Sequence, residues 1–423
     1  MCKDCRGLPA RKRMVSNPVC WISGMNPNTI RSPDQAVAHY LFHITEHLRI
    51  SRGVELSVPI ANIIQNMRFF TPQQAKKLDD LVVIAPVDSQ GNLFRDIDTD
   101  VDPLECLQSG LVRIRTIPVR HVTHFSGDLR QWGLLLATNG RRGRFSFNYH
   151  PCTTVHASAL KAVMQAVPNL SPSILWALWM HEYRDKRICD HMQFTSVNYA
   201  PISPGLTITV GDAERDTRIM DYLCRLQQSS SESLYSPSTQ ENIKREIFMK
   251  GDFWVLTPPD EFPFDEAFKR QHLSPLPHLY NEILRLIRVD VSSKFLMKKT
   301  SLLGLVTDAL LVICEYLPLC CILSLISTSR TMFVTLFPFA NTMAYRKLPI
   351  YEPWYLPEST KEHPWYSLDS NNPIVASPRK VPEFPFLYYA LACYQSPSMK
   401  NRKRIWGIGL QLETLAREYH IIQ

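Results

Sequence analysis

Hydrophobic positions recur at helical spacing in several stretches of the first 190 residues. The start signal Ser32-Pro33-Asp34 precedes apolar residues at helical intervals, which predicts a helix over residues 32–47. Similar patterns predict a helix or mixed segment over residues 58–70, followed by helices over residues 71–80, 154–167 and 172–183.

Short apolar runs alternate with these helical patterns. Residues 81–85 read Leu-Val-Val-Ile-Ala, a composition typical of a buried strand. Further strands are predicted at residues 111–119, 133–137 and 145–149, with turns at 88–91 and 140–143. Residues up to about 190 are therefore predicted to form one α+β domain.

The second half of the chain is patterned differently. A Ser-rich stretch at residues 227–240 has no apolar period and predicts a surface loop or disordered linker. An amphipathic helix is predicted over residues 279–289, before a strongly apolar helical block at 302–346. Eight prolines between residues 349 and 385 favour an extended path, which is followed by predicted helices at 386–394 and 402–419.

Together these patterns predict an α+β fold in three parts. The first is a mixed α+β region at residues 1–290, with its Ser-rich loop at 227–240. A small all-α segment at 296–346 follows, and a Pro-rich, partly helical C-terminal tail occupies residues 347–423.

Composition narrows the class of protein. Hydrophobic residues make up 45% of the 423 residues and charged residues 20%, so the chain as a whole is not expected to be disordered. The net charge of +8 is dispersed and does not predict a nucleic-acid partner. The tightest basic cluster contains Lys400, Arg402, Lys403 and Arg404, and a solvated basic helix start is one interpretation of the segment that holds it.

The sequence favours a cytoplasmic or nuclear, soluble protein. No apolar segment typical of a secretory signal follows the N-terminal residues, and the eleven cysteines are then expected as reduced thiols. Residues 302–326 are apolar, but Asp308, Glu315 and Pro318 interrupt them, so no membrane span is predicted.

The apolar block is the most informative stretch. A helix is predicted up to Tyr316, with Leu310, Ile313 and Leu317 on one stripe, and Pro318 ends it. A second helix follows at once. Two such short apolar helices cannot cover each other completely, so they need a third helix or a partner.

This block resembles the F-box, a helical motif that binds an adaptor protein of ubiquitin ligases. Two positions depart from the F-box pattern, where Val306 replaces the usual first proline and Cys321 the usual aspartate. Segments 147–152 and 396–406 are similar to flanking segments of F-box proteins common in filamentous fungi. The matching residues are Leu305, Asp308, Leu310, Ile313, Leu317, Pro318, Ile322, Leu323, Ser329, Arg330 and Phe333.

The resemblance implies a non-catalytic subunit of a Skp–cullin–F-box ubiquitin ligase, with a Skp-type adaptor, a cullin scaffold and an unknown protein substrate as partners. Leu305, Leu317, Pro318 and Ile322 are expected at or beside the adaptor-facing surface. Leu310 and Ile313 are expected to pack the helices together. The leading substrate-binding candidate is the α+β region, and the aromatic Pro-rich tail is the other. The full set expected to form the adaptor site is Leu305, Asp308, Leu310, Ile313, Leu317, Pro318, Ile322 and Leu323.

Other interpretations stay open at this point. The block could be an ordinary buried helical hairpin, and the chain could be a structural interaction module or a hydrolase or transferase with its active site in residues 30–200. A zinc site would need ligands beyond Cys2, Cys5 and Cys20, and the histidines at 39, 43 and 47 could supply them. The alternating aspartates 96, 98, 100 and 102 lack the other features of a calcium loop. No metal or cofactor is predicted, and no catalytic motif is recognised.

Overall fold

The computed structural model describes residues 33–78, 80–87, 102–110, 112–124, 132–138, 141–146, 153–184, 194, 196–200, 213–228, 234–290, 307–357 and 384–422. This part of the chain is a mixed fold in which helices dominate. It divides into a first unit, residues 1–260 with 401–423, and a second unit, residues 261–400. The first unit is therefore discontinuous in sequence.

An antiparallel sheet in the order β4-β3-β2-β1-β5 lies in the first unit. Strand β1 lies between β2 and β5, where Leu81 pairs with Val119 on one side and His156 on the other. Its residues Val83, Ile84 and Ala85 are all buried, which explains their unbroken apolar run. The strands are β1 (Leu81–Val87), β2 (Arg113–His124), β3 (Trp132–Thr138), β4 (Arg141–Ser146) and β5 (Thr153–His156).

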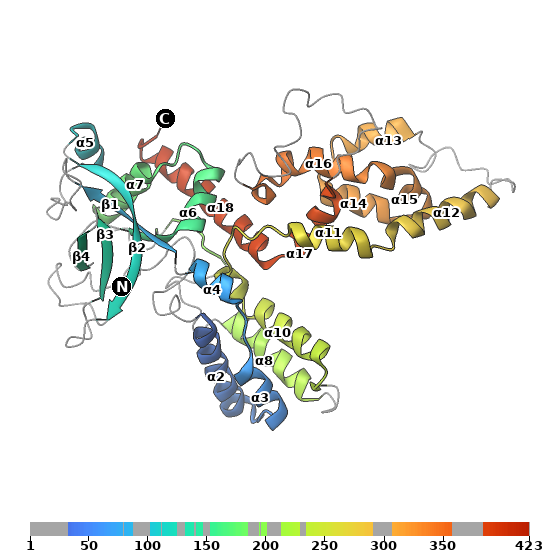
Figure 1. Ribbon diagram of the computed structural model, residues 1–423, viewed down its shortest axis with the longest axis horizontal. Helices are drawn as coiled ribbons and strands as arrows, with labels where there is room; N and C mark the ends of the chain where they lie inside the picture. Colours follow the sequence, from blue (N-terminus) through green and yellow to red (C-terminus); the bar gives the residue numbers. More distant parts are fainter. Residues whose placement is uncertain are drawn as a thin grey trace. The chain divides into compact units, whose positions relative to one another are not determined.

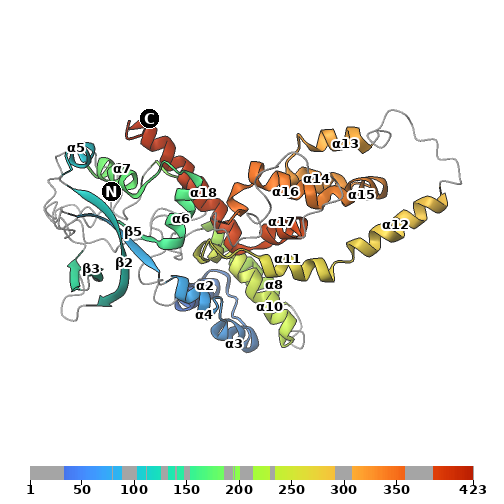
Figure 2. The same cartoon turned by 45° about the horizontal axis from the view of Figure 1, so that its top comes forward.

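Helices complete the core of the first unit: α6 and α7 contact the sheet, whereas α2, α3, α8 and α10 form a group of their own. Helix α7 packs on β1 and β2 (Figures 1 and 2), and its buried Trp176 and Trp179 fill the core. Helix α8 contacts both α2 and α10. The helices are α2 (Pro33–Arg52), α3 (Val58–Asn66), α4 (Pro72–Leu78), α5 (Pro103–Gln108), α6 (Ala157–Ala166), α7 (Pro172–Arg184), α8 (Ala213–Gln227), α10 (Pro237–Lys250), the 3-10 turn η4 (Phe253–Leu256) and most of α18 (Pro397–Glu418).

The second unit is helical throughout its described residues. Helix α17 packs against α11 and α16, and the rings of Phe264 and Tyr389 stack with their centroids 5.1 Å apart. The elements are α11 (Phe264–Leu273), α12 (Leu276–Asp290), α13 (Thr307–Cys314), α14 (Leu319–Ser327), α15 (Arg330–Leu336), η6 (Phe337–Phe339), α16 (Ala340–Tyr351), η7 (Pro353–Tyr355) and α17 (Phe386–Gln395).

Several predicted elements are confirmed, and some boundaries are wrong. The strand at 81–85 and the helices at 172–183 and 279–289 are present. Residues 154–156, predicted as a helix start, belong to β5, because they pair with β1, far away in sequence. Residues 237–240 of the expected Ser-rich loop start α10, with Pro237 in its first turn. Arg141, expected in a turn, begins β4.

The division into units also differs from the predicted parts. Residues 261–290 lie in the second unit, whose core includes Ala267 of α11. Residues 401–423 lie in the first unit, where Ile405, Ile408 and Leu412 of α18 are buried in the core. The local pattern indicates which residues are apolar, but it does not indicate which core they enter.

Candidate protein-binding surface

The joint between α13 and α14 is built around Pro318. Helix α13 ends at Cys314, and Pro318 precedes α14 in an extended conformation, with φ of −60° and ψ of 154°. Its carbonyl oxygen accepts hydrogen bonds from the backbone N–H groups of Cys321 and Ile322, at 3.0 and 3.1 Å. The break predicted at this proline is therefore present.

No helix in the described residues is long and apolar enough to cross a membrane.

A hydroxyl cap starts the third helix of this group. The Oγ of Ser329 accepts a hydrogen bond from the backbone N–H of Met332 at 3.1 Å, and α15 begins at Arg330. Such a cap satisfies one of the free N–H groups of the first turn. It explains why a serine at this position, one of the residues that match the F-box pattern, suits a helix start.

Burial separates the predicted site residues into two groups. Leu310 is buried in the core of the second unit, in agreement with its expected packing role. Ile322 was expected at or beside the adaptor-facing surface, but its side chain is 0% exposed and belongs to the same core. The remaining described members are less buried. Ile313, Leu317, Pro318 and Leu323 are half-buried and Asp308 is exposed, whereas Leu305 lies outside the described residues.

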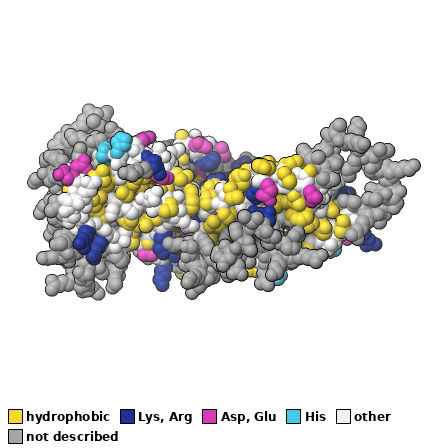
Figure 3. Space-filling model, turned by 90° about the horizontal axis from the view of Figure 1, so that it is seen from above, with side chains coloured by type: hydrophobic (Ala, Val, Ile, Leu, Met, Phe, Trp, Pro, Cys, Tyr) yellow, Lys and Arg dark blue, Asp and Glu magenta, His cyan; other side chains and the backbone are white. Residues whose placement is uncertain are grey.

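Two exposed apolar residues on α13 and the turn that follows it were not predicted as part of the surface. Val312 is 58% exposed and Tyr316 is 79% exposed. Together with Asp308 they recur every four residues, on the side away from the buried Leu310 and Cys314. Hydrophobic side chains, drawn in yellow, are widespread on the face that Figure 3 shows. The four-residue interval was a signal for this second stripe.

Two cations of α16 hold the end of α13. The Nη1 atom of Arg346 lies 3.2 Å from the Oε1 atom of Glu315, and Lys347 Nζ lies 3.6 Å from Oε2. Lys347 also donates a hydrogen bond to the backbone carbonyl of Glu315, and its side chain is only 3% exposed. A cation at the C-terminal end of a helix complements the helix dipole. The stripe is thus presented by a helix fixed at its C-terminal end.

Cys321, at the position of the usual F-box aspartate, cannot replace the negative charge. It is exposed beside Cys320 on the first turn of α14. A hydrogen bond with Cys320 is the main cause that raises the pKa of the Cys321 thiol above its ordinary value. The thiol is therefore protonated at neutral pH, and this corner of the surface is less acidic than the F-box pattern implies.

Comparisons of the chain with protein-family models, with curated proteins and with solved structures find no match. The geometry of this surface is a group of short helices with the exposed Val312 and Tyr316 beside their first joint.

The segment at 396–406, similar to a flanking segment of F-box proteins, forms the first half of α18. The alternative interpretation of this segment, a solvated basic helix start, does not hold for Arg402, which is 3% exposed and donates to the Pro259 carbonyl at 3.1 Å. Asn401 is also buried and donates to the Thr257 carbonyl at 2.7 Å. Burial lowers the pKa of Arg404 to about 10. These polar groups fix where the chain re-enters the first unit. The other similar segment, 147–152, lies outside the described residues.

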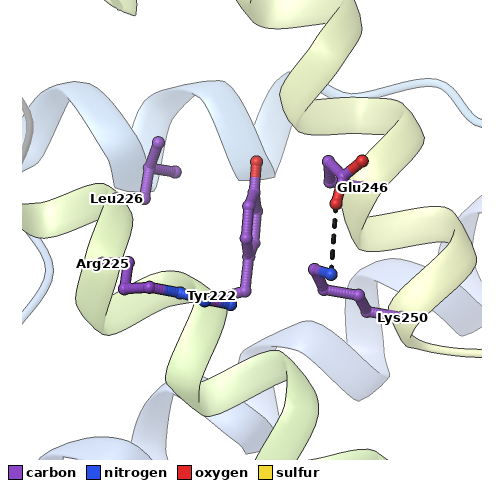
Figure 4. Close-up of a pocket in the computed structure, with 5 residues that line it drawn as sticks. All are labelled: Tyr222, Arg225, Leu226, Glu246 and Lys250. Carbon is purple, nitrogen blue, oxygen red and sulfur yellow. Dashed lines mark ion pairs between the residues drawn. The ribbon is translucent and has the colours of Figure 1, made fainter.

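The first unit contains a shallow hollow of about 330 Å³ between α8 and α10 (Figure 4). Its Glu246 and Lys250 form an ion pair at 3.1 Å, and the Lys250 ammonium lies 5.7 Å from the centre of the Tyr222 ring. The lysine is engaged on both sides, so these contacts serve the packing of α8 on α10. Arg225 and Leu226 complete the lining.

The described residues of the 30–200 region contain no group of side chains that could hold a metal ion. His43 and His47 are exposed, whereas Cys2, Cys5, Cys20, Asp96, Asp98 and Asp100 lie outside the described residues, and nothing is described of the His39 side chain. Asp102 caps α5 by accepting from the Leu104 N–H at 2.8 Å. His156 has a pKa lowered by burial to about 3, but it is only 2% exposed. A side chain so enclosed does not by itself form an acid–base site.

Proposed function

We propose that this protein is the substrate-recognition adaptor of a Skp–cullin–F-box type ubiquitin ligase, which binds the Skp-type adaptor through residues 302–346. One observation carries the proposal. The half-buried Leu317 and Pro318 lie at the joint of two short helices, next to the exposed Val312 and Tyr316. Apolar side chains open to water at such a joint favour a partner that covers them.

The residues of this surface divide into framework and contact groups. Leu310 and Ile322 hold the short helices together from the core. In the proposed complex Leu317, Pro318, Val312 and Tyr316 supply apolar contacts. Asp308, exposed on the same stripe, supplies a polar group at the edge of the surface. Leu305, Ile313 and Leu323 belong to the proposed adaptor site because they match the F-box pattern.

The proposed mechanism is proximity. The bound chain holds a protein substrate near the ubiquitin conjugate that the cullin scaffold recruits, and the catalytic groups belong to those partners. Bringing two reactants onto one scaffold raises their effective concentration, which is a large rate factor in itself. In this proposal the chain needs no catalytic residue and no cofactor of its own.

The first prediction is that changing Leu317 and Pro318 together to Ala weakens binding to a purified Skp-type adaptor by more than about tenfold. Truncating a buried apolar anchor of an interface costs about 2 kcal/mol or more, and 1.4 kcal/mol corresponds to a tenfold change in the dissociation constant. Titration calorimetry measures the affinity, and circular dichroism verifies that the variant is folded.

A second variant avoids the helix joint itself. Tyr316→Asp places a charge where an exposed ring stood, so it should weaken binding to the same extent without disturbing the core. Val58→Asp is the matched control, because Val58 is 72% exposed on α3 of the first unit. If the wild-type chain does not bind at micromolar concentration, the ligase proposal fails, and an interaction module without a ligase link takes its place. If the wild type and Tyr316→Asp bind equally, this surface is not the interface.

A further inference from the structure

A groove of about 420 Å³ lies in the second unit, where α11, the turn after it and α17 meet. Figures 1 and 2 both show α11 beside α17, with α12 continuing beyond the turn. The groove shares no residue with the α13–α14 surface. Its lining is Glu266, Lys269, Arg270, Leu273, Ser274, Pro275, Leu276, Tyr388 and Leu391.

Apolar side chains form much of this lining. Leu276 and Leu391 are half-buried, and Tyr388 is 8% exposed. Leu273, in contrast, is 83% exposed at the end of α11. Burying a leucine side chain that is now open to water contributes about 1.5–3 kcal/mol, so a partner with an apolar side chain would gain free energy here.

Two polar groups of the groove could still bind a ligand, one through a hydrogen bond and one through its charge. The hydroxyl of Tyr388 is buried and has no hydrogen-bond partner among the described residues. Such a group costs about 1–3 kcal/mol unless a partner satisfies it. Lys269 is exposed on α11, and its ammonium forms no ion pair within the described part of the chain.

The other charges are already paired. Arg270 Nε lies 2.9 Å from Glu266 Oε1, and its Nη2 donates to Gln395 Oε1 at 2.8 Å. This ion pair neutralises the acid of the groove and holds α11 on α17. The uncompensated charge that remains along the lining is therefore the positive charge of Lys269, which a carboxylate would complement.

We propose that this groove binds a short segment of a partner protein that carries a leucine-like side chain next to an acidic residue. The apolar side chain packs between Leu273, Leu276 and Leu391, the carboxylate reaches Lys269, and a backbone carbonyl accepts from Tyr388. Identifying this segment as part of the ubiquitination substrate rests on the proposed function. Binding of the segment does not.

The test is selection from a displayed library of random 12-residue peptides on the full-length chain. We expect enrichment of Asp or Glu beside Leu, Ile, Met or Phe. On the Lys269→Glu variant the same library should lose the acidic preference and enrich Lys or Arg instead. Lys161→Glu is the matched control, because Lys161 is exposed on α6 of the first unit, and it should select the same acidic peptides as the wild type.

Fluorescence polarisation then measures individual peptides. Leu273→Ser and Lys269→Glu should each weaken the enriched acidic peptides at least about fivefold, while Ile350→Ser, at a residue that is 68% exposed on α16, should not. Tyr388→Phe should weaken them about threefold with the fold unchanged by circular dichroism.

Several results would overturn the inference. These are no enrichment, an enrichment that Lys269→Glu leaves unchanged, or equal weakening by Lys161→Glu. A dimer of the wild type that Leu273→Ser converts to monomers would assign the groove to a second copy, and loss of Skp-type adaptor binding in Leu273→Ser would assign it to that interface. If the peptides bind as expected but the wild type does not bind the adaptor, the groove stands and only the proposed function fails.

Discussion

His156 is a buried histidine whose two ring nitrogens have no hydrogen-bond partner in the described part of the chain. It ends β5 and is 2% exposed. Burial lowers its pKa from 6.5 to about 3, because the charged imidazolium cannot be solvated there. When the chain unfolds, the ring regains its ordinary pKa and takes up a proton at higher pH than the folded form does.

The pH dependence of stability follows from this difference. A group whose folded pKa is lowered contributes its full stability above pH 6.5, and that contribution falls as the pH drops from 6.5 toward 3. We predict that the first unit loses up to about 1.4 kcal/mol of unfolding free energy per pH unit in this window from His156. Urea unfolding of wild type and His156→Leu at pH 7.5 and 5.0, followed by tryptophan fluorescence, measures the effect.

His156→Leu should be at least as stable as the wild type at pH 7.5 and should lose less stability at pH 5.0. Carboxyl groups titrate in both chains, so the comparison isolates the histidine. The control is His47→Gln, at an exposed histidine, which should keep the acid sensitivity of the wild type. An equal loss in wild type and His156→Leu would contradict the assignment.

For single residues, local effects on the backbone could be predicted from the sequence better than the burial of each side chain. Pro318 stands at the break between α13 and α14, and Leu310 is buried, because proline geometry and the apolar period act locally. Ile322, expected at the adaptor-facing surface, is buried where α14 packs on α15 and α16. Arg402 is buried against Pro259, far away in sequence. The groove around Leu273 could not be predicted, because it joins α11 to α17 across more than a hundred residues of chain.

At the scale of helices, Arg346 and Lys347 of α16 both contact Glu315 at the end of α13, which allows two matched variants to be compared. Lys347 and Arg346 approach the same residue, but the Lys347 side chain is 3% exposed and the Arg346 side chain 40%. Lys347→Met removes a buried charge-assisted hydrogen bond to the end of α13, and we predict a loss of about 2 kcal/mol. Arg346→Met removes an exposed ion pair and should cost at most about 1 kcal/mol.

Thermal or urea unfolding of the second unit compares the two variants, and adaptor binding is measured on the same samples. Lys347→Met should also weaken binding, because the contact of Lys347 with Glu315 positions the segment that carries Val312 and Tyr316. Similar losses of stability in both variants would show that burial of Lys347 does not matter here.

Prediction of elements succeeded where the signal was local. Helix α7 and strand β1 carry dense apolar patterns, and both were predicted within a few residues. The start of α10 was missed because Ser236 and the residues around it read as a loop, whereas Ile243 and Ile247 downstream bury one face of the helix. Residues 154–156 were missed because strand pairing is decided by the distant β1.

For the whole molecule, the two crossings of the chain between units lie close together. Asn401 donates to the Thr257 carbonyl at 2.7 Å within the first unit, and the Glu261 N–H donates to Ser398 Oγ at 3.1 Å within the second. We predict that replacing residues 261–400 by a short Gly-Ser linker leaves the first unit folded. Circular dichroism and limited proteolysis of the shortened chain provide the measurement.

The companion variant deletes residues 401–423 and keeps the second unit. It removes buried side chains of α18 from the core of the first unit, and each large aliphatic side chain lost from a core costs about 2–5 kcal/mol. Several such losses exceed the stability of about 5–15 kcal/mol that a domain typically has. The first unit should then fail to fold. A folded first unit in this variant would contradict the discontinuous division. The side chains concerned are Ile405, Ile408, Leu412 and Leu415.

The discontinuous first unit also sets an order of events on the ribosome. Residues 261–400 are translated before the part of α18 that belongs to the first unit, which begins at Asn401, and at 5–20 residues per second this takes on the order of ten seconds. Throughout that interval the nascent first unit lacks a helix of its own core, while the second unit is completed ahead of it. Chaperones would meet the uncovered apolar side chains in every chain made, and a stop codon just after position 400 would be as damaging to the first unit as one placed far upstream.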